Sequence, residues 1–390
     1  MSTPSQAKVV VWGLLAHAPF GGMIWQVLHH LVGLRQLGYD VWYVEDSDQR
    51  MLNVQITDWV MSAGDNAAYV RPYLKAIGLA DSWIIRSPGS RECFGAGDWD
   101  RLLRLYHEAD LVMNLCGSHK LQPHHDAIRS LMYVETDPVA TQVALASKDE
   151  DNIAELNRYD TLTTYATNLG GDDCLIPESG RTWLTTVPPV VPSHWRTARP
   201  PLSRRLTTVM NWSSPEGFVE WQGQRWSWSK QEPMRLLAAL PNRSPVPLVL
   251  ALRGGSPVVK QELTAAGWMI VGDPRLDRPG VYRRFIRASA GELSAAKEQY
   301  VAPRSGWVSD RTVCYLAASR PAIVERTGIA GIPTGEGLLV FTGVDEAAAA
   351  IEALVSDYAR HAAAARELAE TYFAADKVLA SLLSRAGFEP

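Results

Sequence analysis

The sequence predicts an α/β protein made of two doubly wound domains. The chain of 390 residues is longer than one hydrophobic core usually supports. Apolar, strand-like runs alternate with helical stretches in both halves. A proline-rich stretch, residues 187–205, separates the halves and is typical of a semi-rigid linker. We therefore expect a first domain over 1–198, a second over 199–372 and a final helix over 373–390.

The first element is a β-loop-α-β unit. Residues 8–15 form a continuous apolar run, as expected of a parallel strand buried on both faces. A helix follows, with apolar residues at helical spacing: Ile24, Leu28, Leu31 and Leu34. The intervening Gly21-Gly22 pair allows the backbone to approach a ligand closely. The unit indicates a right-handed crossover, but it lacks the G-x-G-x-x-G pattern of dinucleotide sites.

The sequence of residues 305–341 predicts a turn, a helix, a buried strand and a glycine-rich loop. Ser309 and Asp310 stand where an N-cap accepts hydrogen bonds from the first backbone N–H groups of the helix. Pro321 ends that helix. A helix start that faces glycine loops and is flanked by Arg304 and Arg311 suits a diphosphate. An ordinary helix–strand unit with surface arginines would show the same spacing.

These motifs resemble those of GT-B glycosyltransferases, in particular the glycogen-synthase-like group and a bacterial subgroup of it. The Gly-Gly loop with a helix ending in LRQLGYDV is similar to the opening of these enzymes. ASRPAIVERTG followed by PTGEGLLVF is similar to their donor-binding signature, and YVETDPVATQ and NLGGDDC resemble the bacterial subgroup. The resemblance covers most of the chain. It implies two Rossmann-like domains facing across a cleft, with the C-terminal helix crossing back to the first domain.

The implied activity is transfer of a sugar from a nucleotide-diphosphate sugar to a hydroxyl or amine. The acceptor would be a small molecule or a saccharide, as in natural-product or saccharide biosynthesis, and the group favours retention of the anomeric configuration. Two alternatives stay open. One is a sugar-nucleotide epimerase of GT-B shape, which would need no acceptor. The other is a non-catalytic homologue that binds nucleotide sugars without turning them over.

The donor site is expected mainly on the second domain. Lys230 loosely matches the lysine that neutralises the donor diphosphate in glycogen-synthase-like enzymes, and Lys297 is a further cation. Such cations replace a divalent ion, so we expect no metal and no cofactor besides the donor. The predicted nucleotide-sugar-binding residues are Gly21, Gly22, Lys230, Arg304, Ser309, Asp310, Arg311, Thr312, Thr327, Gly328, Gly335 and Glu336.

One departure from the family pattern concerns its Glu-x7-Glu signature, whose carboxylates contact sugar and ribose hydroxyls. Counting back from Pro321 places Gly306 and Cys314 at the two positions. We expect Glu336, a carboxylate in the glycine-rich loop, to act as a substitute.

The candidate catalytic residues are His17 and Asp137, which follow strands of the first domain. Ligands of open α/β sheets bind beyond the carboxyl ends of the strands. In inverting GT-B enzymes a histidine in a loop similar to that of His17 deprotonates the acceptor, and a carboxylate orients it. Asp137 would be that carboxylate, although Asp137-Pro138 is also a turn signal. Because His17 could act as this base, inversion of the anomeric configuration stays open.

Acceptor contacts are expected from further strand ends and from a tryptophan-rich segment. A histidine at a strand end often contacts the sugar in glycogen-synthase-like enzymes, and tryptophan faces stack on sugars or aglycones. Surface positions for the polar residues and local core packing for the tryptophans are the alternatives. The predicted acceptor-binding residues are His119, Glu135, Trp226 and Trp228.

Composition argues against several classes of protein. A net charge of −4 gives no electrostatic basis for nucleic-acid binding. No apolar run approaches a membrane span, and the first residues lack a secretory h-region. The 4 cysteines have no C-x-x-C spacing and suit reduced thiols. We expect His124-His125 on the surface and not at a metal, because the chain has no H-x-x-x-H motif or carboxylate cluster at ligand spacing. We expect a cytoplasmic protein without a structural metal, and the oligomeric state is left open.

Overall fold

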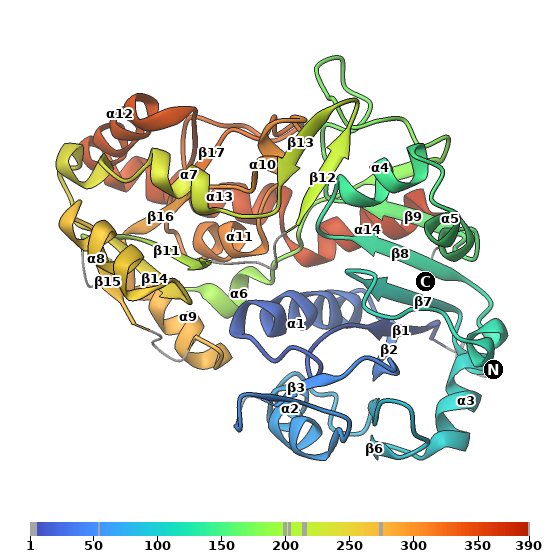
Figure 1. The fold of residues 1–390 in the computed structure, drawn as a ribbon. Helices are drawn as coiled ribbons and strands as arrows, with labels where there is room; N and C mark the ends of the chain where they lie inside the picture. The colour runs from blue at the N-terminus through green and yellow to red at the C-terminus, as the bar shows by residue number, and fades with distance from the viewer. Residues whose placement is uncertain are drawn as a thin grey trace.

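The computed structural model describes residues 6–53, 55–197, 201, 204–212, 217–272 and 276–388. Two mainly parallel sheets, each with its own helices, make up most of the molecule (Figure 1). The predicted pair of doubly wound α/β domains is therefore confirmed. The predicted boundary between residues 198 and 199 lies outside the described residues, so its position stays a prediction.

The N-terminal sheet has the strand order β10-β9-β8-β7-β1-β2-β5-β6. All neighbours pair in parallel except β5 and β6. The strand order reverses between β1 and β7, which makes their carboxyl ends the expected ligand edge. The strands are β1 (Lys8–Trp12), β2 (Asp40–Glu45), β5 (Trp83–Arg86), β6 (Cys93–Gly95), β7 (Leu111–Leu115), β8 (Leu131–Glu135), β9 (Thr161–Thr164) and β10 (Trp183–Thr185).

The remaining N-terminal elements are helices and one small hairpin. The helix predicted after the Gly-Gly pair begins at the first of these glycines. The elements are α1 (Gly21–Gln36), α2 (Gly64–Ala76), α3 (Trp99–Glu108), η1 (Pro123–Ala127), α4 (Ala140–Ala146), α5 (Glu150–Leu156), α6 (Pro192–Trp195) and the hairpin of β3 (Met51–Asn53) and β4 (Asp58–Val60).

The C-terminal sheet is entirely parallel, with the order β15-β14-β11-β16-β17-β18. Its strand order reverses between β11 and β16. The strands are β11 (Leu206–Asn211), β14 (Leu248–Arg253), β15 (Met269–Val271), β16 (Gly291–Ser294), β17 (Ala322–Glu325) and β18 (Leu338–Phe341), and β12 (Phe218–Trp221) and β13 (Gln224–Ser227) form a separate hairpin.

The remaining elements of the second half of the chain are helices. They are α7 (Gln231–Leu236), η2 (Leu240–Arg243), α8 (Pro257–Ala265), α9 (Pro279–Ala288), α10 (Glu298–Val301), α11 (Asp310–Ala317), α12 (Gly343–Ser356), α13 (Tyr358–Tyr372) and α14 (Ala375–Arg385). The predicted cap of α11 is present: the Ser309 hydroxyl accepts a hydrogen bond from the backbone N–H of Arg311. No helix in the described part of the chain is long and apolar enough to cross a membrane.

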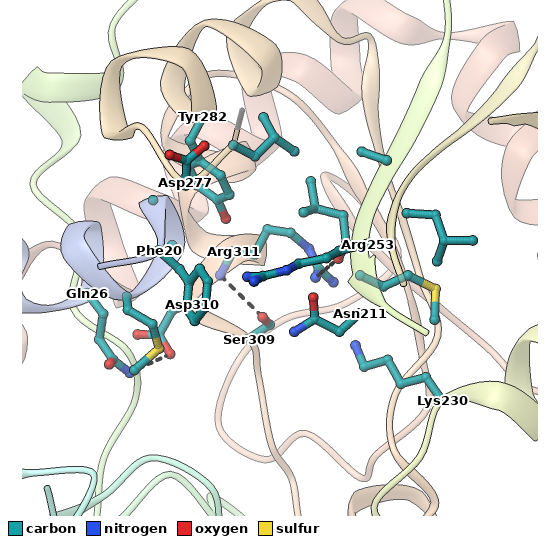
Figure 2. Close-up of a pocket in the computed structure, with 18 of the residues that line it drawn as sticks. Phe20, Gln26, Asn211, Lys230, Arg253, Asp277, Tyr282, Ser309, Asp310 and Arg311 are labelled. Atoms are coloured by element: carbon teal, nitrogen blue, oxygen red, sulfur yellow. Dashed lines mark hydrogen bonds between the residues drawn. The ribbon is translucent and has the colours of Figure 1, made fainter. Parts of the chain in front are cut away.

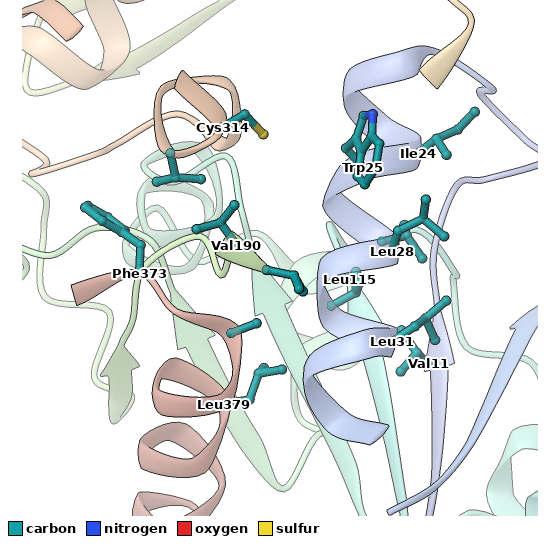
Figure 3. Packing of buried hydrophobic residues seen from close by; sticks show 14 of the residues in the cluster. Val11, Ile24, Trp25, Leu28, Leu31, Leu115, Val190, Cys314, Phe373 and Leu379 are labelled. Carbon is teal, nitrogen blue, oxygen red and sulfur yellow. The ribbon is translucent and has the colours of Figure 1, made fainter. Parts of the chain in front are cut away.

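The C-terminal helix packs on the N-terminal domain, as the fold resemblance implies. A Cβ on Gly33 of α1 would lie 2.6 Å from Leu379 and 2.8 Å from Ala375, so a glycine is what allows α14 to approach α1. The apolar cluster of this region also includes Val190, Cys314 and Phe373 (Figure 3). Both domains thus share one buried core behind the cleft.

Candidate functional site

A cavity of about 590 Å³ lies between the two domains (Figure 2). This volume is in the range of small-molecule sites. Asn211 ends β11 and Arg253 ends β14, so the cavity adjoins the carboxyl ends of the C-terminal strands. The starts of α1 and α11 adjoin it from the other sides. The lining residues used below are Phe20, Gly21, Gly22, Gln26, Asn211, Lys230, Arg253, Asp277, Tyr282, Lys297, Ser309, Asp310 and Arg311.

The cavity is rich in cationic side chains. Lys230 makes no hydrogen bond or ion pair with any residue that the structure describes, and burial together with Arg311 and Lys297 lowers its pKa to about 7. The Arg253 guanidinium lies 4.4 Å from the centroid of the Phe20 ring. An anion placed here would meet Lys230 and Arg253, to which the described residues offer no ion-pair partner, and its charge would raise the pKa of Lys230 again.

Arg311 reaches the cavity, but its guanidinium is held by the protein. Nη1 donates to the carbonyl oxygen of Val209 over 2.5 Å, and Nη2 donates to Ser294 Oγ over 2.6 Å. Nε donates to Glu292, whose side chain is completely buried. The predicted diphosphate contact therefore sits on a residue that also joins β11 and β16 to α11.

Asp310 faces the N-terminal domain. Its Oδ2 accepts a hydrogen bond of 2.9 Å from Gln26 Nε2, whereas its Oδ1 is buried without a partner in the described residues. Gln26 Oε1 accepts a hydrogen bond of 3.3 Å from Cys116 Sγ. Burial raises the pKa of Asp310 to about 7.

The Gly21-Gly22 pair lines the cavity, and Gly21 also joins the two domains. The Gly21 N–H donates to the carbonyl oxygen of Leu276 over 3.1 Å, and a Cβ on Gly21 would lie 2.2 Å from that oxygen. Gly22 lies against the ring of Tyr282. The sequence predicted that a ligand approaches the backbone closely at this glycine pair. At Gly21, the backbone of Leu276 from the other domain makes that close approach instead.

The structure does not bring all of the predicted donor residues to the cavity. Arg304 forms an exposed ion pair with Asp173, and Glu336 forms one with Arg360 of α13. Glu336 is thus paired on the surface and outside the cavity lining, and its substitution for the signature carboxylates stays a prediction. The residues that lie away from the cavity lining are Arg304, Thr312, Thr327, Gly328, Gly335 and Glu336.

His17 and Asp137 are not hydrogen-bonded to each other. Asp137 forms an ion pair of 3.0 Å with Lys297, across the domain boundary. The His17 ring lies 6.1 Å from that of Trp59, its Nδ1 is buried without a partner in the described part of the chain, and burial lowers its pKa. His17 thus lies beside the β3–β4 hairpin and outside the cavity lining, without the orienting carboxylate that was predicted.

His119 occupies a closed environment. Its ring stacks on Trp12 with centroids 4.8 Å apart, Nε2 accepts from the Asp46 N–H over 2.7 Å, and Nδ1 contacts Ser118 Oγ over 2.8 Å. Burial lowers the pKa of His119 to about 3. With both ring nitrogens in use, this histidine supports the sheet edge and offers no free group to an acceptor.

Glu135 is also directed into the protein. Its Oε2 accepts hydrogen bonds from Gln142 Nε2 (2.5 Å) and Thr164 Oγ1 (2.6 Å), and only 2% of the residue is exposed. Burial raises the pKa of this carboxyl to about 7.

The predicted tryptophans pack locally. Trp226 is buried with Val219, Val139 and Val143, between the β12–β13 hairpin and α4. Trp228 lies over Gly217 of the same hairpin and is 37% exposed. Local packing, the alternative named from the sequence, accounts for both.

A buried polar cluster lies at the ends of β2 and β5. Oδ2 of Asp46 accepts hydrogen bonds from His124 Nε2 (2.7 Å), His125 Nε2 (3.1 Å) and the Tyr106 hydroxyl (3.0 Å). Arg86 pairs with the other carboxylate oxygen. The two histidines and Asp46 have the mutual spacing of metal ligands. Because the adjacent guanidinium already neutralises the carboxylate, the cluster is explained as a hydrogen-bond network.

Several residues that line the cavity were not predicted from the sequence. Asn211 and Arg253 end buried strands, a signal that could have identified them. Gln26 lies inside a helix that reads as apolar, so no local pattern marks it.

No family model matches the chain, and no curated protein sequence matches it. Solved structures do match. AviGT4, a glycosyltransferase involved in avilamycin A biosynthesis, is 14% identical, with 98% of this chain and 97% of that chain covered and a TM-score of 0.56. HepE of Anabaena in complex with UDP-glucose is also 14% identical, with 97% and 99% covered and a TM-score of 0.56. An α-glucosyltransferase with UDP and a mismatched 13-mer DNA is 10% identical, with 98% and 99% covered and a TM-score of 0.59. These likenesses extend over both domains and show the GT-B fold.

Proposed function

We propose that the protein is a glycosyltransferase that moves a sugar from a nucleotide-diphosphate sugar to a hydroxyl or amine of a small molecule or saccharide. The observation that carries the proposal is Lys230, a cation without an anionic partner in the described residues, inside a cavity between two Rossmann-like domains. Among structures with the same fold, AviGT4 is a glycosyltransferase and HepE was solved with UDP-glucose, which supports the proposal.

The diphosphate of the donor is placed against Lys230, Lys297 and Arg253. The N-terminal ends of α1 and α11 line the same cavity, and their helix dipoles add partial positive charge there. Stabilising a departing diphosphate is the main electrostatic demand of the reaction, and fixed cations meet it without reorganisation. Because these side chains supply the positive charge, the proposed reaction does not depend on a divalent ion.

In the transfer step, the bond between the anomeric carbon and the diphosphate oxygen breaks, and a bond from that carbon to the acceptor oxygen forms. The acceptor proton goes to the departing phosphate if configuration is retained, or to a protein base if it is inverted. Burial lowers the pKa of His17, which suits a base, but His17 lies outside the cavity lining and Asp137 pairs with Lys297 instead of orienting it. We therefore favour retention, as the family resemblance does.

A small acceptor fits the charge of this chain. The α-glucosyltransferase of the comparison was solved with DNA. Here the net charge is −4, which opposes association with a polyanion, so we propose that no nucleic acid is bound.

Equilibrium binding of nucleoside diphosphates tests the proposal. Lys230→Met should lower the affinity for the tightest-binding nucleoside diphosphate by roughly 10- to 100-fold, as expected for loss of a charge-assisted contact. The matched control is Lys75→Met, at an exposed position near the end of α2, which should leave the affinity unchanged. Absence of binding to the unaltered protein, or equal affinity in the Lys230 variant, would refute the proposed site.

A further inference from the structure

Asp310 and Gln26 meet in the wall of the cavity from opposite domains. Asp310 is the first residue of α11, and Gln26 lies in the second turn of α1. Figure 2 shows the hydrogen bond that joins them, which is 2.9 Å long from Nε2 to Oδ2. The Cys116 thiol donates to the other end of the Gln26 amide, which fixes its NH₂ group toward Asp310. The position of the Asp310 carboxyl group is thus set by contacts from both domains.

One oxygen of this carboxyl group is unused. Asp310 Oδ1 is shielded from solvent and has no hydrogen-bond partner among the described residues. A buried acceptor without a donor is unfavourable, so a ligand that brings a donor gains binding energy at this point. Among the described residues that line the cavity, the other carboxylate is Asp277. Asp277 lies beside Tyr282 on the side of α9, away from Gln26 (Figure 2).

Asp310 is also adjacent to the groups assigned to the diphosphate. It follows Ser309, the N-cap of α11, and precedes Arg311, and all three line the cavity. In a nucleotide-diphosphate sugar, the sugar is attached directly to the terminal phosphate. A group that immediately neighbours the phosphate-binding helix start is therefore in reach of the sugar ring.

We propose that Asp310, positioned by Gln26, binds a hydroxyl group of the transferred sugar through its free Oδ1. The inference rests on the proposed function, because it places the sugar beside a bound diphosphate. A carboxyl oxygen is a strong acceptor for a sugar hydroxyl, stronger than a neutral amide or hydroxyl. Asp310 would then distinguish nucleotide sugars from nucleotides without a sugar.

The electrostatic surroundings of Asp310 are compatible with a nearby diphosphate. Burial raises the pKa of Asp310 to about 7, and the charge of Asp137 contributes in the same direction. A carboxyl group that is neutral for part of the time near pH 7 repels a diphosphate less than a fully ionised aspartate does. The same group can also donate a hydrogen bond when it is protonated.

Calorimetric titration with paired ligands tests this inference. UDP, GDP and dTDP are titrated alone and as their glucose-bearing forms, and the pair that binds the unaltered protein most tightly is used. Asp310→Ala should change the affinity for the nucleoside diphosphate by no more than about twofold. It should lower the affinity for the nucleotide sugar by roughly 10-fold or more. Gln26→Ala should act in the same direction with a smaller effect, because it removes the positioning contact and leaves the carboxyl group.

Two controls separate sugar recognition from other effects. Asp376→Ala removes an exposed carboxylate from the first turn of α14 and should leave both affinities unchanged. Asp310→Asn keeps the side-chain volume. It should bind the nucleotide sugar less tightly than the unaltered protein and more tightly than Asp310→Ala. Equal weakening of both ligands by Asp310→Ala, or no weakening of either, would overturn the role in sugar recognition. If the unaltered protein bound neither ligand, the proposed function itself would fail, and this inference with it.

Discussion

Arg311 donates a hydrogen bond through Nε to Oε1 of Glu292, and the two side chains form an ion pair at the edge of the cavity. Glu292 lies in the middle of the C-terminal sheet and is fully buried, while Arg311 continues to Val209 and Ser294. The pair therefore connects the helix start that faces the cavity to the strands behind it. It makes the geometry of the helix start dependent on a buried charge pair.

Replacing Arg311 should therefore destabilise the fold before it reports on binding. Arg311→Ala leaves Glu292 buried without its cation, and we expect a loss of about 3–5 kcal/mol in the free energy of unfolding. Urea denaturation measures this loss. The control is Arg243→Ala, which breaks an exposed pair with Asp345 and should cost less than about 1 kcal/mol. An Arg311→Ala protein as stable as the parent would contradict the structural role.

Gly306, at the first signature position, cannot carry a side chain without distortion. Its φ is +79°, and a Cβ would lie 2.4 Å from Thr167 Oγ1 and 2.5 Å from the Asn168 nitrogen. Gly331 has a φ of +73° with open space around it, so Gly331→Ala should cost only the backbone strain, about 1–3 kcal/mol. Gly306→Ala adds a packing clash of about 1–3 kcal/mol. Equal melting temperatures for the two variants would show that the contact with Thr167 and Asn168 is unimportant.

Glu135 should make the protein less stable as the pH rises. Its pKa is raised from 4.5 to about 7 in the folded protein, so between these pH values the folded state holds a proton that the unfolded state has lost. Stability therefore falls with rising pH across this window, by roughly 3 kcal/mol for this group. Glu135→Gln removes the titration while keeping the acceptor for Gln142 and Thr164.

The check is urea unfolding of both proteins at pH 5 and pH 7.5. The variant should gain stability relative to the parent at the higher pH, because the other buried carboxyls titrate equally in both proteins. A constant difference between the two proteins at both pH values would mean that Glu135 does not titrate in this window.

Nucleotide binding and turnover should survive excess chelator. Lys230, Lys297 and Arg253 line the cavity and supply the positive charge that the diphosphate requires. The measurement compares nucleotide-sugar turnover with and without EDTA, followed by added magnesium or manganese. Loss of turnover in EDTA with recovery on adding metal would assign the diphosphate to a metal site instead.

The sequence was informative about the edge of the sheet and less so about side-chain direction. The N-cap pattern led to Ser309 and Asp310 and the family resemblance led to Lys230, and all three line the cavity. The rule that ligands bind at strand ends was less successful. The same rule led to His119 and Glu135, whose polar atoms turn inward to Ser118, Asp46 or Gln142. Strand-end position fixes where the backbone is, whereas the side-chain direction depends on neighbouring elements that the local sequence does not contain.

Contacts between the domains were beyond the reach of the sequence. Gln26 pairs with Asp310, and Gly21 pairs with Leu276, over separations of more than 250 residues. Glu336 shows the same dependence: it lies in a glycine-rich loop, and α13 supplies Arg360 as its partner on the surface. Such pairs depend on how elements distant in sequence pack together, and no motif encodes that arrangement.

The most direct test of the proposed glycosyl transfer is proton NMR of a bound nucleotide sugar incubated with the protein and no acceptor. A glycosyltransferase should slowly release nucleoside diphosphate and free sugar, because water replaces the acceptor. We predict that the sugar first appears with the anomeric configuration of the donor, and that Lys230→Met slows its release. A nucleotide sugar converted to its epimer would identify an epimerase, and one that stays intact while bound would identify a binding protein. Either result would contradict the proposed transfer reaction.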